Sequence, residues 1–180
     1  MKEHDRSVVF GTAAREQDGV AGKDNWRTPK ALFEREHLVY TFTLDAAADA
    51  TNHLCEQWLG PGSSLNEDGL KASWFGHTVW CNPPYSMCAA FIAKAATERV
   101  MNRVTSRVLV PSRTDTKWWH LYVWNEAKGT WREGVSADFI KGRVKFVDPD
   151  ADAAGDGAPF PSVLITFDGS VKPLSTCTLW

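Results

Sequence analysis

The sequence predicts an α/β protein built on a mostly parallel sheet, with an antiparallel hairpin at its C-terminal end. Segments with helical spacing alternate with short apolar runs along most of the chain, and two such runs close it. With 180 residues, 43% of them hydrophobic, the chain can bury one core but is too short for a second full domain. We therefore expect a flexible arm over residues 1–24 and a single domain over residues 25–180.

The domain is expected to begin with a helix and a strand. Thr28 is suited to cap a helix that has Pro29 at its first position, and apolar residues within 31–39 supply a stripe for burial. Residues 40–49, YTFTLDAAAD, then predict a strand that ends in an aspartate and alanines.

The remaining elements follow from the same periodicities and from clusters of turn residues. In chain order they are a short helix or irregular crossing (50–59), a loop (60–69), a strand (78–81), a helix (86–100), a strand (107–110), a helix (116–127) and two strands (142–148 and 162–169). An acidic loop rich in Gly, Ala and Pro separates the last two strands.

The cysteines and the apolar runs indicate a cytoplasmic protein without a metal site. The N-terminus has no basic segment followed by an apolar stretch, and no run approaches the ~18 apolar residues of a membrane span. Cys55, Cys81, Cys88 and Cys177 form no CxxC pair, so reduced and mostly buried thiols are expected. The spacings of the nearby histidines match no standard zinc site.

Positive charge is concentrated in the middle of the chain. Residues 86–145 carry 11 Lys/Arg against 5 Asp/Glu, although the whole chain has a net charge of −2. Two interpretations are open for Lys94, Arg99, Arg103 and Arg107: the solvated face of a helix and the turn after it, or a surface that faces phosphates.

The stretch VWCNPPYSM, residues 79–87, carries the strongest chemical signal. Asn82 to Tyr85 follow a predicted strand directly, and ligands of open α/β sheets bind at the carboxyl ends of strands. Two consecutive prolines stiffen the loop and leave its carbonyls outside any continuing helix. An amide oxygen, a carbonyl and an aromatic ring suit a flat heterocycle with an exocyclic amine, such as adenine. The alternative is a Pro-rich turn without chemical significance.

In this interpretation the Asn82 side-chain oxygen and the Pro83 carbonyl accept the two N6 hydrogens of adenine. Their acceptance directs the nitrogen lone pair at an electrophile and stabilises the positive charge that develops on nitrogen. Pro84 holds the turn, and Tyr85 stacks on the base. No side-chain nucleophile is required.

The order of several blocks along the chain resembles the phage and prophage DNA N-6-adenine methyltransferases. The blocks are WRTPKALF (26–33), LDAAAD (44–49), EDGL (67–70), VWCNPPYS (79–86), VPSRTDTKWWH (110–120), FIKGRVKF (139–146) and APFPSVLITF (158–167). The resemblance implies a Rossmann-like S-adenosylmethionine-dependent methyltransferase fold. It also implies methyl transfer to the N6 amine of an extruded adenine in double-stranded DNA, in a phage or restriction-modification setting. A monomer or a homodimer would be compatible with it.

The resemblance also implies a cofactor site. Thr28 and Pro29 look like the N-terminal cofactor-binding element, with a plain helix cap as the alternative. Asp45 is similar to the acidic residue that holds the methionine amino group, and Ala46 follows it in the cofactor loop. A strand-end cap is the competing role for Asp45.

A second segment of the cofactor site is expected at EDGL. Asp68 resembles the residue that accepts from the adenine amine of the cofactor, with Leu70 packed on that ring, and a simple turn aspartate is the alternative. The chain departs from the family in having alanines at 46–48, where glycine is common. Glu56 is the nearest candidate for the carboxylate that binds the ribose.

DNA contacts are expected from the C-terminal third of the domain. Phe160 can stack on the other face of an extruded base, whereas Trp119 and Trp124 are expected in the core. Side chains that can contact phosphates are Arg113, Lys117, Lys141, Arg143 and Lys145. No insertion is long enough for a separate recognition domain, so short or relaxed sequence specificity is expected.

Alternative functions remain open on the residues alone. The same tetrapeptide chemistry serves enzymes that methylate RNA, protein glutamine or cytosine N4, and a catalytically silent DNA-binding module is also possible. Cytosine-C5 chemistry is disfavoured because it needs a Pro-Cys nucleophile, whereas Cys81 precedes Asn82 at a strand end.

Overall fold

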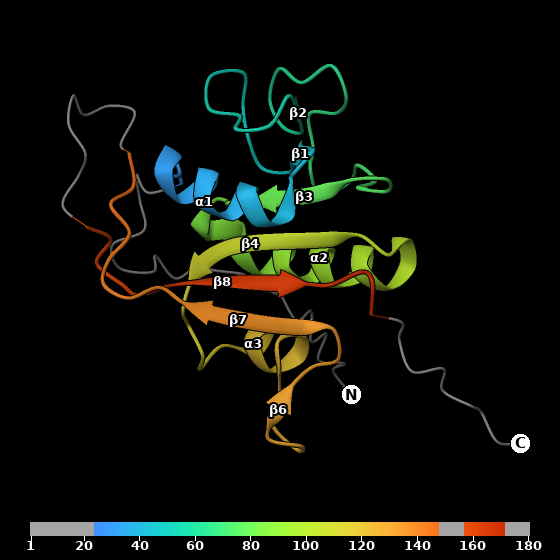
Figure 1. The fold of residues 1–180 in the computed structure, drawn as a ribbon, viewed down its shortest axis with the longest axis vertical. Helices are drawn as coiled ribbons and strands as arrows, with labels where there is room; N and C mark the ends of the chain where they lie inside the picture. The colour runs from blue at the N-terminus through green and yellow to red at the C-terminus, as the bar shows by residue number, and fades with distance from the viewer. Residues whose placement is uncertain (1–23, 148–156, 172–180) are drawn as a thin grey trace, which may run out of the picture.

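The computed structural model describes residues 24–147 and 157–171. Six strands form one sheet in the order β2-β1-β3-β4-β8-β7 (Figure 1). Their bounds are β1 Leu44–Asp45, β2 Gln57–Trp58, β3 Thr78–Cys81, β4 Thr105–Pro111, β7 Val135–Phe139 and β8 Ser162–Phe167. The first four strands in this order run parallel, and β8 is antiparallel to both of its neighbours. The predicted α/β class, with a mostly parallel sheet and an antiparallel hairpin, is confirmed.

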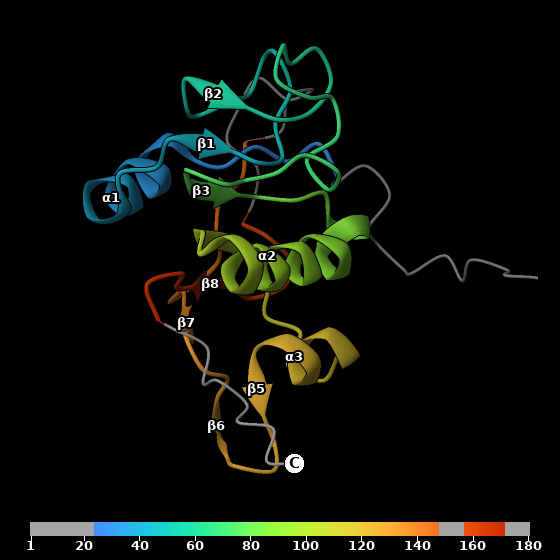
Figure 2. The same ribbon diagram turned by 90° about the vertical axis from the view of Figure 1, so that its right-hand side faces the viewer.

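Helices cover both faces of the sheet (Figure 2). Helix α1, Lys30–Tyr40, lies on one face, and α2, Cys88–Asn102, and α3, Lys117–Tyr122, lie on the other. Side chains of successive strand residues alternate between the two cores. In β3, for example, Val79 and Cys81 pack with the α2 side, whereas Trp80 packs with Phe33 of α1. No helix among the described residues has the length and apolar character needed to cross a membrane.

The strand order reverses between β1 and β3. From β1 the chain moves outward to β2, then returns to β3 and continues in the opposite direction to β4. Loops that leave the carboxyl ends of β1 and β3 therefore diverge, which opens a crevice at this edge of the sheet.

Two details of the N-terminal helix differ from the prediction. Pro29 occupies the N-cap position, and no side chain caps the helix, so Thr28 is not its cap. The buried residues of α1 are Phe33 and Glu36, whereas Leu38 is 85% exposed and Val39 74%. The apolar stripe was therefore extended too far, because Leu38 and Val39 face solvent while Phe33 and Tyr40 pack against the sheet.

The prediction of a strand over residues 142–148 is wrong. Among the described residues of this segment, 142–147, only Val147 pairs, in a bridge with Arg27, and the hairpin partner of β8 is β7. Val144 and Phe146 are buried alternately, as in a strand, but they pack over the α1 face of the sheet. The alternation of buried residues is therefore present, but residues 142–147 do not pair with β8. The acidic loop lies largely outside the described residues, as do nearly all of the predicted arm and Cys177.

The predicted helix over residues 116–127 ends early, at Tyr122. Two short strands follow, β5 Trp124–Asn125 and β6 Thr130–Trp131, and pair as an antiparallel hairpin. Trp124 and Trp131 face each other across this hairpin, with ring centroids 5.1 Å apart. Trp119 is buried as expected, and Trp124 is half-buried against the same core.

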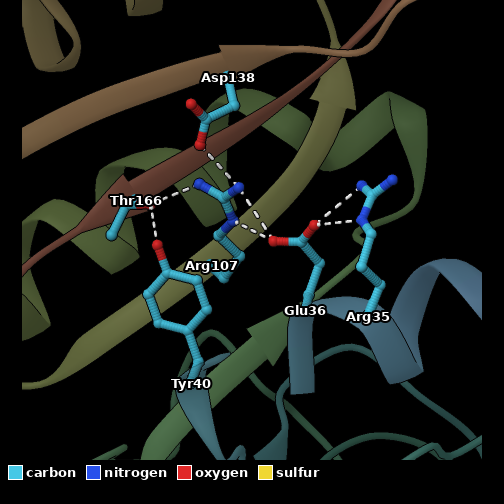
Figure 3. Close-up of polar contacts among 6 residues, drawn as sticks. All are labelled: Arg35, Glu36, Tyr40, Arg107, Asp138 and Thr166. Carbon is cyan, nitrogen blue, oxygen red and sulfur yellow. Dashed lines mark hydrogen bonds and ion pairs between the residues drawn. The ribbon is translucent and has the colours of Figure 1, made fainter. Parts of the chain in front are cut away.

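A buried arginine connects α1 to the sheet (Figure 3). From β4, Arg107 Nε donates to Glu36 Oε2 at 3.1 Å, and its Nη2 lies 3.0 Å from the same oxygen and 2.7 Å from Asp138 Oδ2. Its Nη1 donates to Thr166 Oγ1 at 2.6 Å, and the Tyr40 ring lies under the guanidinium. Arg107 and Glu36 are both buried, so the removal of either side chain would leave the other with an uncompensated buried charge.

Three of the four cations with two open interpretations, Lys94, Arg99 and Arg107, therefore form neither a solvated helix face nor a phosphate-facing surface, whereas Arg103 is exposed. Arg99 is buried as well, and its Nε donates to the Asp168 carbonyl at 3.2 Å. Lys94 pairs with Glu98 through a side chain that is only 17% exposed. These cations serve the packing of α2 and β4 within the domain.

Removing the Glu36 carboxylate should destabilise the fold strongly. Glu36→Ala leaves Arg107 buried, with the exposed Asp138 as its only anionic partner among the residues that the structure describes, and we expect a loss of about 3 kcal/mol in the free energy of unfolding. Urea denaturation measures this loss. The matched control is Glu34→Ala on the same helix, where the Lys30–Glu34 pair is solvent-exposed and its loss should cost at most about 0.5 kcal/mol. Equal effects of the two substitutions would contradict the role of the buried pair.

Candidate active site and cofactor cavity

A cavity of about 590 Å³ opens at the carboxyl ends of β1 and β3. This volume lies within the range of small-molecule sites. Five segments and two side chains of the α2 region line it: residues 24–28, 45–49 with 52 and 54, 59–61, 67–70, and 80, 82 and 84, together with Met87 and Phe91. The cavity therefore coincides with the point at which the strand order reverses.

Asp45 ends β1 and lies in the wall of this cavity. Its Oδ2 accepts from the backbone N–H of Leu54 at 3.1 Å, and its Oδ1 accepts from that of Ala47 at 3.4 Å. Burial raises the pKa of the Asp45 carboxyl to about 6, against the opposing effect of these two hydrogen bonds. A cation that binds beside a buried carboxylate stabilises its ionised form, which burial otherwise disfavours.

Two glycines that the sequence marked only as loop residues support the alanine loop after Asp45. A Cβ atom on Gly69 would lie 2.0 Å from the Ala46 carbonyl oxygen, and one on Gly60 would lie 1.9 Å from that of Ala48. Neither position can hold a side chain without displacing backbone. The two glycines thus allow the neighbouring loops to pack closely against the backbone of Ala46 and Ala48.

Asp68 lines the cavity, but its carboxylate also organises its own turn. Oδ1 accepts from the N–H of Leu70 at 3.0 Å, and Oδ2 lies 3.0 Å from the Lys71 ammonium. Leu70 lines the cavity beside it, as does Thr28. Pro29 and the exposed Glu56 are absent from the lining, whereas Asp49, which the sequence did not single out, is part of it.

Asn82 reaches the cavity with one of its two amide atoms engaged. Its Nδ2 donates to the Trp26 carbonyl at 3.1 Å. Its Oδ1 is buried and accepts no hydrogen bond from the part of the chain that the structure describes. Such an oxygen is costly unless a ligand supplies the donor, so its position favours a hydrogen-bond donor bound at this edge of the cavity.

Tyr85 does not line the cavity and lies among three other aromatic rings. Its ring meets Phe160 at 5.0 Å, Trp26 at 6.0 Å and Phe146 at 6.1 Å, all edge to face. The Tyr85 hydroxyl is buried without a partner among the described residues, and burial raises its pKa above the usual range. Phe160 therefore packs directly against the tetrapeptide, and its contact with an extruded base stays a prediction.

The buried thiols are poor nucleophiles. Burial raises the pKa of Cys55 and of Cys88 to about 12 and that of Cys81 well above its usual value. Among the described residues, no group of three His, Cys, Asp or Glu side chains is placed to hold a metal ion. His53 and His77 instead share hydrogen bonds with the Cys55 carbonyl and the Thr43 hydroxyl.

Exposed cations lie on the segment beside this aromatic group. Lys141, Arg143 and Lys145 are exposed, and they alternate with the buried Val144 and Phe146. The alternation directs the three cations to solvent. Arg113 and Lys117, which follow β4 at the same edge of the sheet, are also exposed.

Comparison with known proteins places the chain in a family. Residues 16–179 match the family model described as DNA N-6-adenine-methyltransferase (Dam). A DNA N-6-adenine-methyltransferase of Haemophilus phage HP1 is 26% identical over 157 residues, which are 83% of this chain and 84% of the relative. One from Escherichia phage T1 is 29% identical over 154 residues, which are 80% of this chain and 62% of the relative. The chain therefore belongs to the DNA N-6-adenine-methyltransferase (Dam) family, as its sequence suggested, and is a DNA adenine methyltransferase.

Proposed function

We propose that the cavity binds S-adenosylmethionine and that Asn82 presents an extruded adenine of double-stranded DNA to it. The family implies a methyl donor and a DNA substrate, and the proposal concerns which donor binds and which residues act. The observation that carries it is the buried Oδ1 of Asn82 at the edge of the cavity, which has no hydrogen-bond partner among the described residues. An acceptor in that position suits the N6 amine of adenine.

The charge of the cavity supports this cofactor. S-adenosylmethionine carries a sulfonium, an ammonium and a carboxylate, so its net charge is +1, and methyl transfer converts it to a thioether of net charge zero. Among the lining residues that the structure describes, Arg27 is the only cation, and the carboxylates are Asp24, Asp45, Asp49, Glu67 and Asp68. Such a lining favours the methyl donor over the demethylated product.

We propose individual roles for the residues of the cavity. Asp45 holds the ammonium of the methionine part, with Ala46 and Thr28 beside it and Pro29 fixing the start of α1. Asp68 and Leu70 contact the adenine of the cofactor, and Asp68 also keeps the turn that brings Gly69 against Ala46. Asp49 replaces Glu56 as our candidate for the ribose hydroxyls, because Glu56 lies outside the lining.

In the proposed reaction, Asn82 Oδ1 and the Pro83 carbonyl accept the two hydrogens of the N6 amine. The bound cofactor supplies an electrophilic methyl group. Acceptance by the two oxygens directs the nitrogen lone pair at that methyl group, and it stabilises the positive charge on nitrogen until a proton leaves to solvent. Pro84 keeps the turn rigid, and Tyr85 and Phe160 contact the faces or edges of the extruded base.

The DNA backbone is proposed to lie along the exposed cations that follow β4 and β7. Lys141, Arg143 and Lys145 flank the aromatic group, so phosphates held by them would bring a flipped base towards Tyr85. Arg113 and Lys117 extend this surface. We further propose that residues 25–180 act as one methyltransferase domain, and that the enzyme works as a monomer or a homodimer.

Asn82→Ala should abolish most catalysis and spare cofactor binding. We expect kcat to fall by at least ~10², since one of the two acceptors for the N6 amine is lost, while the Kd for S-adenosylmethionine stays within about threefold. Labelled methyl transfer to DNA and calorimetry measure the two quantities. Asn102→Ala, at the far end of α2, is the control and should leave kcat unchanged. A parental kcat in Asn82→Ala would refute the proposed role of the tetrapeptide.

The affinity for S-adenosylmethionine should rise with pH through the pKa of Asp45. Below about 6 the carboxyl is neutral and cannot pair with the ammonium, whereas above 6 it is ionised. If only the ionised form binds, the Kd should fall about tenfold between pH 5 and pH 7. Calorimetry across this range measures the Kd, and Asp45→Asn should flatten its dependence on pH.

The same raised pKa means that, without ligand, the contribution of Asp45 to the free energy of unfolding is greatest below pH 3.8 and is lost as pH rises through about 6.

Lys141→Gln and Arg143→Gln should weaken DNA binding at all sequences alike. Each removes a phosphate contact, so we expect the slope of log K against log salt to become shallower by about 1 per substitution. Fluorescence anisotropy at several salt concentrations measures the slope. Arg103→Gln is the matched control, because Arg103 lies at the C-terminal end of α2, at the opposite edge of the sheet. If Arg103→Gln changes the slope as much as they do, the proposed DNA surface is wrong.

A further inference from the structure

Residues 24–27 form a strap that joins the catalytic loop to the segments on either side of it. The backbone of Arg27 pairs with that of Val147 through two hydrogen bonds, of 2.9 and 3.0 Å. The Arg27 side chain donates to Thr51 Oγ1 at 2.9 Å, and the Trp26 ring stacks on Phe146 with centroids 5.4 Å apart. The strap thus lies against both the cofactor loop and the basic segment.

One residue of the strap supplies a helix cap that the catalytic motif lacks. Pro84 occupies the N-cap position of the 3₁₀ turn Tyr85–Met87, which leads into α2, and no local side chain caps this turn. Proline has no side-chain acceptor with which to cap it. Asp24 takes this role from elsewhere in the chain: Oδ1 accepts from the Ser86 N–H at 3.0 Å, and Oδ2 accepts from the Ser86 hydroxyl at 2.7 Å.

A second residue of the strap determines which atom Asn82 presents. Only the amide nitrogen can donate to the Trp26 carbonyl, 3.1 Å away, so that contact turns Oδ1 to the opposite side. Without the carbonyl the amide could rotate by half a turn and present its N–H₂ group to the substrate. The N–H₂ group of Asn82 would then face the N6 amine of adenine, from which it cannot accept a hydrogen bond.

We propose that Asp24 is a positioning residue for methyl transfer. By holding Ser86, it keeps the strap against the catalytic loop, so that the Trp26 carbonyl holds the Asn82 amide with its oxygen towards the N6 amine. The inference rests on the proposed role of Asn82 and adds the reason that this chain has asparagine there. Aspartate has no proton to offer the Trp26 carbonyl at neutral pH.

Kinetics of three variants test the proposal. Asp24→Ala removes both contacts with Ser86, and kcat should fall about tenfold or more while the Kd for S-adenosylmethionine stays within about threefold. Asp24→Asn removes the charge but can keep both contacts, because its oxygen accepts from the Ser86 N–H and its nitrogen donates to the hydroxyl. It should restore kcat to within about threefold of the parent. In the presence of Asp24→Ala, Ser86→Ala should have little further effect on kcat.

Either of two results would overturn the proposal. An unchanged kcat in Asp24→Ala would show that the strap does not position Asn82. A weakened Kd in both Asp24 variants with unchanged kcat would mean that Asp24 acts only through its charge in the cavity. Circular dichroism melting of each variant identifies any loss of folding. If Asp24→Ala proves unfolded, the Ser86→Ala variant alone decides, with a lowered kcat expected and an unchanged one contradicting the proposal.

Asn82→Asp gives an independent test. A carboxylate still offers an acceptor to the N6 amine, but it meets the Trp26 carbonyl without a proton between the two oxygens. We expect kcat at neutral pH to fall about tenfold or more, and a parental value would contradict the role of the Trp26 carbonyl. The proposed function has a separate test, because a fully active Asn82→Ala would refute it. If Asn82→Ala is inactive while Asp24→Ala and Asn82→Asp are fully active, only the positioning role of the strap is refuted.

Discussion

The site depends on the parallel pairing of β1 with β3. The Thr43 N–H donates to the Thr78 carbonyl at 2.8 Å, and the Ala46 N–H donates to that of Trp80 at 2.9 Å. This register brings the end of the strand that carries Asp45 beside the end of the strand that leads into Asn82. A shift of β1 by one residue against β3 would turn its side chains to the opposite face of the sheet. Because the strand order also reverses here, the same pairing opens the cavity between the loop after Asp45 and the loop that carries Asn82.

Polar contacts of different strength hold the rest of the domain around this pair. The ion pair between Arg107 and Glu36 is buried and connects α1 to the sheet. The contacts of Asp24 with Ser86 are exposed and hold only the strap. An exposed contact contributes little to global stability, so changes there can alter catalysis while the fold persists. This division separates the buried pair that maintains the domain from the exposed contacts proposed to position its site.

The sequence predicted those parts of the site that depend on local patterns. A short apolar strand ending in Asn-Pro-Pro-Tyr, and another ending in Asp45, sufficed to place both at one edge of a parallel sheet. Long-range contacts could not be predicted in this way. Nothing near Pro84 indicates that Asp24 caps its turn, and nothing near Arg107 indicates that a carboxylate from α1 neutralises it. The alternation in residues 142–148 was misread because burial against a sheet face and pairing at a sheet edge give the same period.

Identification of the methyl acceptor tests whether Asn82 presents an extruded adenine. The purified protein would be given labelled S-adenosylmethionine with unmethylated duplex DNA, RNA or protein as parallel acceptors, and the products would be separated as nucleosides or amino acids. If Asn82 has this role, the label is found in N6-methyladenine from duplex DNA. Label in methylated cytosine, or only in RNA or protein, would contradict the proposed fit between the Asn82 oxygen and an extruded adenine.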